Sequence, residues 1–133
     1  MSGRFRSFVI FLSCLVIAMS ASAQEGHPLK GTWLGDWGPN KDKRNDLVIE
    51  LRWNGKVLSG TINPGEDDVH LDKVTLDSKA WSIHMEGDGK DSQGHVVHYV
   101  IDGKIQSLGS PHRWITGTWI QGTEQGDFKL IRQ

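Results

Sequence analysis

Cysteine is almost absent from this chain. The single cysteine lies at position 14, ahead of the part that we expect to fold. The folded part therefore forms no disulfide and offers neither a thiol nucleophile nor a thiolate ligand for a metal. Its stability must come from packing and from sheet closure. The chain also lacks the Gly-x-Ser-x-Gly motif that positions the nucleophile in α/β-hydrolases.

Charge of one sign is not concentrated anywhere in the chain. The 15 Lys and Arg residues and the 16 Asp and Glu residues are interspersed, and the formal net charge is −1. Nucleic-acid-binding domains usually carry a basic stripe or patch, so we expect no nucleic-acid partner. After residue 23 there is neither a helical period nor a second long apolar run. We therefore expect no membrane span in the mature chain.

Residues 1–23 have the features of a cleavable signal peptide. Arg4 and Arg6 supply a positive start, an apolar run covers residues 8–17, and small residues follow at Ala21-Ser22-Ala23. Signal peptidase recognises this order of features, which predicts cleavage before Gln24. A retained membrane anchor and lipid attachment at Cys14 are the alternatives. The sequence thus predicts an exported protein, either periplasmic or extracellular.

Cleavage at that point leaves 110 of the 133 residues. The signal peptide holds two of the basic residues and no acid, so 13 basic and 16 acidic residues remain, a net charge of −3. This length suits one domain with one modest core. We expect residues 24–28 to form a flexible leader and residues 29–133 to form the single domain.

The clearest strand covers residues 47–53. Leu47, Ile49, Leu51 and Trp53 alternate there with polar or smaller residues, which is the pattern of a half-buried strand. Asn54-Gly55 then has the composition of a two-residue type I′ hairpin turn. Such a turn would place Trp53 opposite Lys56 and Leu51 opposite Leu58.

Turn residues at short intervals divide the mature chain, this strand included, into about eight alternating segments, with Asp102-Gly103 expected to be one of the turns. Gly31-Thr32-Trp33 near one end recurs as Gly117-Thr118-Trp119 near the other. Glycine beside a large aromatic residue indicates close packing or a tight bend, so we expect the first and last strands to be neighbours. The predicted fold is all-β, an eight-stranded antiparallel up-and-down barrel. A two-sheet β-sandwich is the alternative.

The two chain ends give the sequence a resemblance to the calycins, the group of lipocalin-like and avidin-like barrels. Those families commonly open on a Gly-x-Trp strand and pack a basic residue of the last strand over that tryptophan. Gly31, Trp33 and Arg132 stand in these places, and the resemblance implies that they close the barrel. Residues 55–62 also look like the second hairpin of avidins, but Ile62 replaces the aromatic residue that avidins direct at biotin. The Gly-Asp-Trp-Gly-Pro run at residues 35–39 is similar to small exported bacterial proteins of unassigned function.

Tryptophan is the residue in excess, with six copies in the chain. Core packing is the simplest explanation, because an indole ring buries a large area and needs one hydrogen-bond partner. An aromatic-lined pocket for a sugar or an apolar small molecule is the functional alternative, and anchoring at a membrane interface is a third. We assign Trp33 to structure. The ligand-binding candidates lie near strand ends or on inner faces: Trp37, Trp53, Trp81, Trp119 and Tyr99.

The six histidines show no metal-binding spacing. His95 and His98 are three residues apart, so a strand would turn them to opposite faces. His84 and His98 meet across a hairpin only if its register allows it. Three acids near a glycine-rich tip, at positions 86, 88 and 91, lack the order of an EF-hand loop. We predict no catalytic residue, no metal ligand and no cofactor.

Three functions follow as hypotheses. The first is non-catalytic binding of a small apolar molecule or a glycan inside an aromatic-lined barrel. The second is a protein-interaction module, such as a protease inhibitor or an envelope-assembly factor, that uses residues 24–28 and 38–45. The third is a small hydrolase that uses His84 or His98 with a neighbouring acid.

Overall fold

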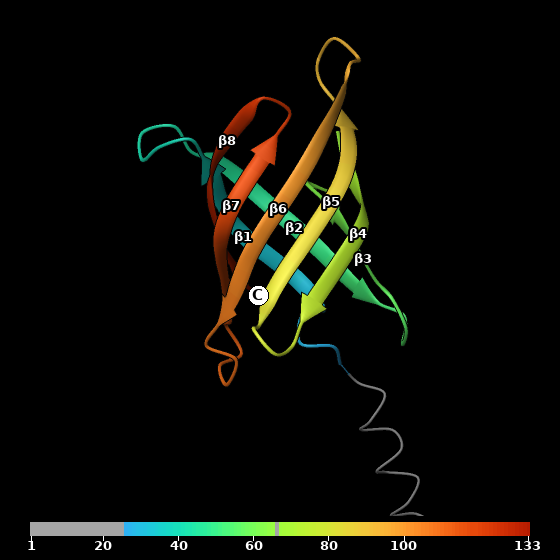
Figure 1. Ribbon diagram of the computed structural model, residues 1–133, viewed down its shortest axis with the longest axis vertical. Helices are drawn as coiled ribbons and strands as arrows, with labels where there is room; N and C mark the ends of the chain where they lie inside the picture. Colours follow the sequence, from blue (N-terminus) through green and yellow to red (C-terminus); the bar gives the residue numbers. More distant parts are fainter. Residues whose placement is uncertain (1–25, 66) are drawn as a thin grey trace, which may run out of the picture.

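The computed structural model describes residues 26–65 and 67–133. The expected signal peptide, residues 1–23, lies outside the described residues. Eight strands make up the fold: β1 (Gly31–Gly38), β2 (Asn45–Trp53), β3 (Leu58–Ile62), β4 (Val69–Asp77), β5 (Ser82–Lys90), β6 (Val96–Gln106), β7 (Trp114–Gln121) and β8 (Glu124–Arg132). Each strand pairs antiparallel with the next, and β1 also pairs with β8 (Figure 1). The predicted eight-stranded up-and-down barrel is confirmed, and the sandwich alternative is wrong.

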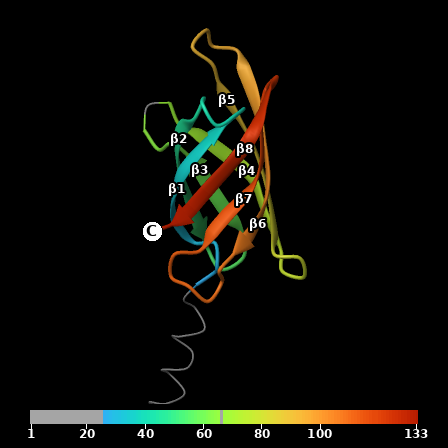
Figure 2. The same cartoon turned by 90° about the vertical axis from the view of Figure 1, so that its left-hand side faces the viewer.

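Closure between β1 and β8 depends on a close approach of the two backbones. Trp33 lies opposite Arg132, Gly35 opposite Leu130, and Trp37 opposite Phe128. Figure 2 shows the two strands side by side. A Cβ atom on Gly35 would lie only 1.7 Å from the Lys129 carbonyl oxygen, so this position requires glycine. The expectation that the ends of the chain meet is confirmed.

Alternate residues of the strands point inward, as the period of two requires. They form one apolar core that includes the fully buried Trp33 and Trp119. Other members come from seven of the strands: Ile49, Leu51, Ile62, Leu71, Ile83, Met85, Ile101, Ile115, Phe128 and Leu130. An eight-stranded barrel has an interior just wide enough to be filled by side chains. These side chains fill the interior of the barrel except near the end at which β1 finishes.

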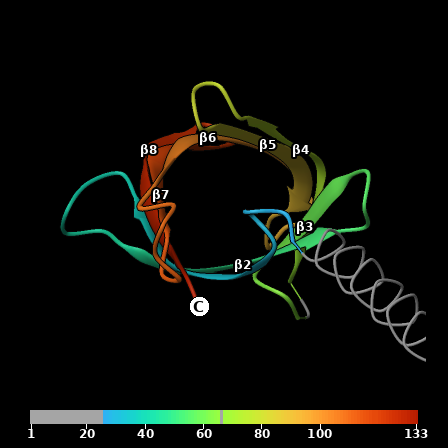
Figure 3. The ribbon, with the colours of Figure 1, turned by 90° about the horizontal axis from the view of Figure 1, so that it is seen from below.

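One end of the barrel is sealed by the residues that precede β1. The Trp33 indole Nε1 donates to the Leu29 carbonyl at 2.8 Å, and Leu29 is fully buried. Arg132 Nε donates to the Lys30 carbonyl at 2.9 Å, and Arg113 Nη1 donates to the Pro28 carbonyl at 2.6 Å. Figure 3 looks at this end and shows the segment before β1 within the ring of strands. We call it the sealed end.

The β2–β3 hairpin differs from its predicted register. Trp53 pairs with Leu58 and Leu51 with Gly60, so the loop has four residues rather than two. The reason is the Asn54 side chain, whose Oδ1 accepts hydrogen bonds from the backbone N–H groups of Lys56 and Val57 at 2.9 and 2.8 Å. The change in register is two residues, so each side chain keeps its predicted face.

The expected turn at Asp102-Gly103 is also wrong, because β6 runs unbroken through both residues. Gly103 lies in close contact with the neighbouring strand β7 and with the core. A Cβ atom on it would lie 2.8 Å from the Thr116 carbonyl oxygen and 2.9 Å from the Phe128 ring. The glycine therefore marks tight packing inside a strand, which is the second meaning of glycine in strands.

Candidate functional site

A cleft of about 520 Å³ opens at the end of the barrel opposite the sealed end. We call it the mouth cleft. It lies where β1, β3 and β7 end and where β2 and β4 begin, and β6 adds Tyr99, so six strands contribute to its wall. Its lining combines three aromatic rings with amide and charged groups: Trp37, Arg44, Asn45, Asp46, Ile62, Asn63, Asp67, Val69, Tyr99, Trp119 and Gln121.

The aromatic residues form the floor of the cleft. Trp37 stacks on Trp119 with ring centroids 5.5 Å apart and planes at 20°, and Tyr99 meets Trp119 edge-on at 6.0 Å. Trp119 is only 1% exposed, and its indole Nε1 donates to Gln121 Oε1 at 3.2 Å. Offset and edge-on aromatic contacts are favourable, so the floor is a packed layer. A ligand in the cleft would rest above this layer, not inside the barrel.

Asparagine side chains hold the rim. Asn63 directly follows β3 and has a left-handed backbone, φ 47°, a conformation that asparagine tolerates better than most residues. Its backbone N–H donates to the Val48 carbonyl at 2.7 Å, and its Oδ1 accepts from the Val48 N–H at 3.0 Å. Asn45 Nδ2 lies 3.5 Å from the Trp37 carbonyl. The β2 and β3 walls of the cleft are thereby fixed to each other.

Arg44 ties the β1–β2 loop to the last strand. Its guanidinium binds Asp36 Oδ1 at 2.7 Å and Asp127 Oδ1 at 2.5 Å, and it also reaches the Gly38 carbonyl at 3.3 Å. The hydrogen bonds to Asp127 and Asp36 raise the pKa of Arg44. The positive charge beside the cleft is thus already matched by two carboxylates.

Tyr99 supplies a buried hydroxyl-bearing ring to the cleft. The residue is 8% exposed and lies on the inner face of β6. Burial raises the pKa of Tyr99, and the negative charge of Glu124 raises it further. The phenol therefore stays neutral and able to donate a hydrogen bond across the physiological range.

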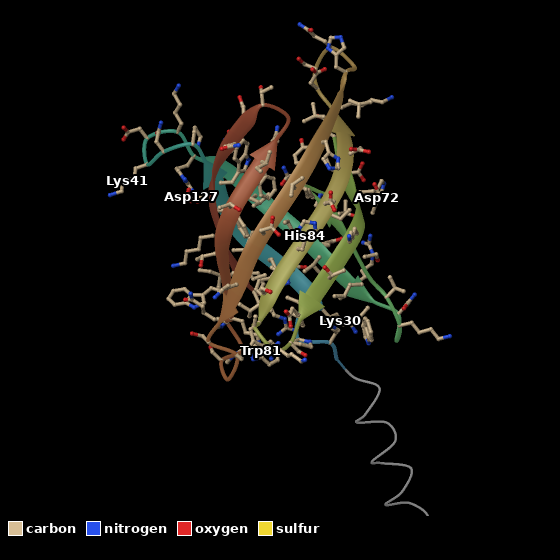
Figure 4. All side chains as sticks on the ribbon, in the orientation of Figure 1. Lys30, Lys41, Asp72, Trp81, His84 and Asp127 are labelled. Atoms are coloured by element: carbon tan, nitrogen blue, oxygen red, sulfur yellow. The ribbon has the colours of Figure 1, made fainter. Side chains whose placement is uncertain are left out.

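Three of the five ligand-binding candidates meet at this cleft, namely Trp37, Tyr99 and Trp119. Trp53 does not join them, because it ends β2 at the sealed end, where it packs on the His27 ring at 4.7 Å. Trp81 is the last residue of the β4–β5 turn at the same end (Figure 4), is 37% exposed and has a φ of 51°. The period-2 pattern identifies the face of a side chain but not its height along the barrel.

The residues that the calycin resemblance singled out lie together at the sealed end. Gly31 has a left-handed φ of 134°, and a Cβ atom there would lie 3.0 Å from Arg132 Nε. Trp33 is fully buried directly opposite Arg132 in the β1–β8 pair. The arginine side chain thus lies beside the glycine that opens β1.

A second polar cluster lies on the outer face of β5 and β6, and we call it the histidine ladder. It runs Asp102–His84–Glu86–His98–Asp88, with Glu86 at its centre, and Figure 4 labels one member, His84. His84 binds Asp102 and Glu86 at 2.5 and 2.9 Å. His98 binds Asp88 and Glu86 at 2.6 and 3.2 Å. The sequence predicts that both histidines can lie on one hairpin. The ladder becomes apparent only from the strand pairing, in which His84 lies opposite Asp102 and Asp88 lies opposite His98.

The ladder favours protonated imidazoles. Hydrogen bonds to Asp102 and then to Glu86 raise the pKa of His84, and bonds to Asp88 and then to Glu86 raise the pKa of His98. The bond from His84, followed by the bond from His98, lowers the pKa of Glu86. Both nitrogens of each ring face a carboxylate, whereas a catalytic histidine needs one nitrogen directed at a nucleophile or substrate.

Within residues 26–65 and 67–133, no three His, Cys, Asp or Glu side chains are arranged to hold a metal ion. The same part of the chain has no helix of the length and apolarity that a bilayer crossing needs. A second hollow of about 440 Å³ shares Asp67 with the mouth cleft; its other acids are Asp68, Asp88 and Asp91.

Comparison of the chain with protein-family models, with curated proteins and with solved structures finds no match. The strand order and the β1–β8 pairing are compatible with a calycin-like fold.

Proposed function

We propose that this protein is an exported, calycin-like binding protein that holds a small molecule or a glycan in the mouth cleft without carrying out chemistry. The observation that carries the proposal is the cleft of about 520 Å³ above Trp37, Tyr99 and Trp119. Binding sites in small barrels commonly lie in the mouth and combine aromatic surface with a few polar groups. The opposite end is closed by Trp33 and Leu29.

The composition of the cleft favours a polar ligand with one apolar face over a wholly apolar one. The aromatic floor suits the apolar face of a sugar ring, and the amides of Asn45 and Gln121 suit its hydroxyl groups. The layers below the floor are filled with side chains, which leaves the rim as the place for a glycan or another polar small molecule.

Indole fluorescence and native mass spectrometry test the proposal. We expect a panel of mono- and disaccharides, small apolar ligands and an envelope extract to include at least one ligand that shifts the emission of the wild-type protein. Replacing Trp37 by Phe should reduce the response, whereas the matched change Trp81→Phe at the sealed end should not. The proposal fails if no member of the panel changes the emission and if natively purified protein carries no bound molecule.

A protein-interaction module remains the second candidate, because the β1–β2 loop projects beyond the barrel wall (Figure 3). Its residues 39–43 are exposed. A partner that docks there should be lost when residues 40–43 are replaced by Gly-Ser linkers. Retention of the partner by this variant would exclude the loop as the contact.

Export itself has a direct test. Expression of the full chain in a bacterium, followed by fractionation and intact-mass measurement, should give a mature protein that begins at Gln24. Recovery of the uncleaved chain from the cytoplasm would contradict the export part of the proposal.

A further inference from the structure

The rim of the mouth cleft carries negative charge that the protein does not neutralise. Asp46 and Asp67 line the cleft, and in the described part of the chain neither forms an ion pair. The one cation in the lining, Arg44, is already bound to Asp36 and Asp127. The second hollow adds further carboxylates around the shared Asp67. An anion entering the cleft would meet like charges on two sides.

The second observation is the Tyr99 hydroxyl. Tyr99 is more than nine-tenths buried and lines the cleft, and within residues 26–65 and 67–133 its hydroxyl makes no hydrogen bond to the protein. The ring is buried, but the hydroxyl oxygen is not among the buried, partnerless atoms of the described residues, which are Arg113 Nε and Trp114 Nε1. A ligand hydroxyl or amine above the aromatic floor could therefore form a hydrogen bond with this hydroxyl in the cleft.

Together these observations narrow the ligand class. We infer that the mouth cleft prefers a ligand that joins a ring with a positive charge, such as an amino sugar, over neutral or anionic analogues of the same size. The ammonium group would lie near Asp46 or Asp67, the ring above Trp37, and a ring hydroxyl against Tyr99. This inference rests on the proposed binding function and adds to it the charge of the ligand.

Three disaccharides of similar size provide the test: unacetylated chitobiose, which carries amines, N,N′-diacetylchitobiose, which is neutral, and digalacturonate, which is anionic. Titration calorimetry at about pH 6, below the pKa of an ordinary amine, should give the amine-bearing sugar about a tenfold tighter Kd than the neutral sugar. Its advantage should shrink as salt is raised, because screening weakens interactions of exposed charges.

Substitutions at the rim test whether its carboxylates cause the preference for a positively charged ligand. Asp46→Asn combined with Asp67→Asn keeps the side-chain size and should bring the amine-bearing and neutral sugars to equal Kd. The matched control is Asp72→Asn, which removes a carboxylate from the outside of β4 (Figure 4) and should leave the difference intact. Tyr99→Phe should weaken the binding of the amine-bearing and the neutral sugar to the same extent, since it removes the Tyr99 hydroxyl that both would contact.

The outcomes separate the inference from the proposal on which it rests. Equal binding of the three disaccharides, tighter binding of the anionic one, or an amine preference that survives the Asp46/Asp67 double substitution would each overturn the inference and leave mouth binding in place. If none of the three binds and the fluorescence panel is also silent, the proposed function fails as well.

Discussion

Replacing Gly35 by alanine should disrupt the junction that closes the barrel. The new Cβ atom would lie 1.7 Å from the Lys129 carbonyl oxygen, whereas ordinary van der Waals contact begins at 3.4 Å. The two backbones would have to separate by about the difference, roughly 1.7 Å. Ladder hydrogen bonds between β1 and β8 cannot stretch that far and remain bonds.

The expected cost follows from those contacts. Loss of two ladder bonds costs about 1 kcal/mol each, and strain from overpacking adds about 1–3 kcal/mol. We therefore expect Gly35→Ala to lower the free energy of unfolding by about 3–5 kcal/mol. For a domain of this size that corresponds to a fall in Tm of about 10 °C or more.

Urea unfolding followed by tryptophan fluorescence measures this change. Gly109 is the matched control, because a Cβ atom there would meet nothing within 4 Å; Gly109→Ala should change the stability by less than about 0.5 kcal/mol or raise it slightly. A Gly35→Ala protein within about 0.5 kcal/mol of the wild type would refute the close approach of β1 and β8 on which the closure argument depends.

The other predictions concern the sealed end, the rim and the ladder. Trp33→Phe should lower the free energy of unfolding by about 1–3 kcal/mol in the same assay, because the buried Leu29 carbonyl loses its donor; no change would show that the bond is not needed. Arg44→Gln should cost only about 1 kcal/mol, since its partners are largely exposed, but should speed proteolysis of residues 39–43; equal cleavage rates would contradict the clamp. The ladder should stabilise the fold most between about pH 4.5 and 6.5, the ordinary pKa values of Glu86 and His84. Because folding raises the pKa of His84, its contribution to stability is complete below pH 6.5 and is lost as the pH rises through the pKa of the folded state. Because folding lowers the pKa of Glu86, its contribution to stability is complete above pH 4.5 and is lost as the pH falls through the pKa of the folded state. The stability difference between wild type and His84→Gln should therefore shrink from pH 6 to pH 9, and a constant difference would contradict the ladder.

The fold could be predicted because its main signal is local. Alternation over residues 47–53 identifies a strand and its inner face without any knowledge of its partner. The β2–β3 register could not be predicted as reliably, because Asn54-Gly55 fits both a two-residue turn and the four-residue loop that the Asn54 side chain stabilises. Asp102-Gly103 shows the same limit, since glycine serves both turns and close strand packing.

The candidate site was predictable in composition but not in position. Trp37, Tyr99 and Trp119 lie at one height because β1, β6 and β7 are staggered around the barrel, and stagger depends on every register between them. Trp53 and Trp81 share the same residue type and alternation but lie at the opposite end. The histidine ladder likewise needs the β5–β6 pairing, which no local pattern of His and Asp residues encodes.

The chain enters and leaves the barrel at the sealed end, where Gly26 precedes the Leu29–Trp33 contact and Gln133 donates its backbone N–H to the Thr32 carbonyl. Tethering through either terminus, to a bead, a fusion partner or a surface, would therefore hold the cleft outward and unobstructed. Immobilisation by a terminal tag is thus a suitable format for ligand screening.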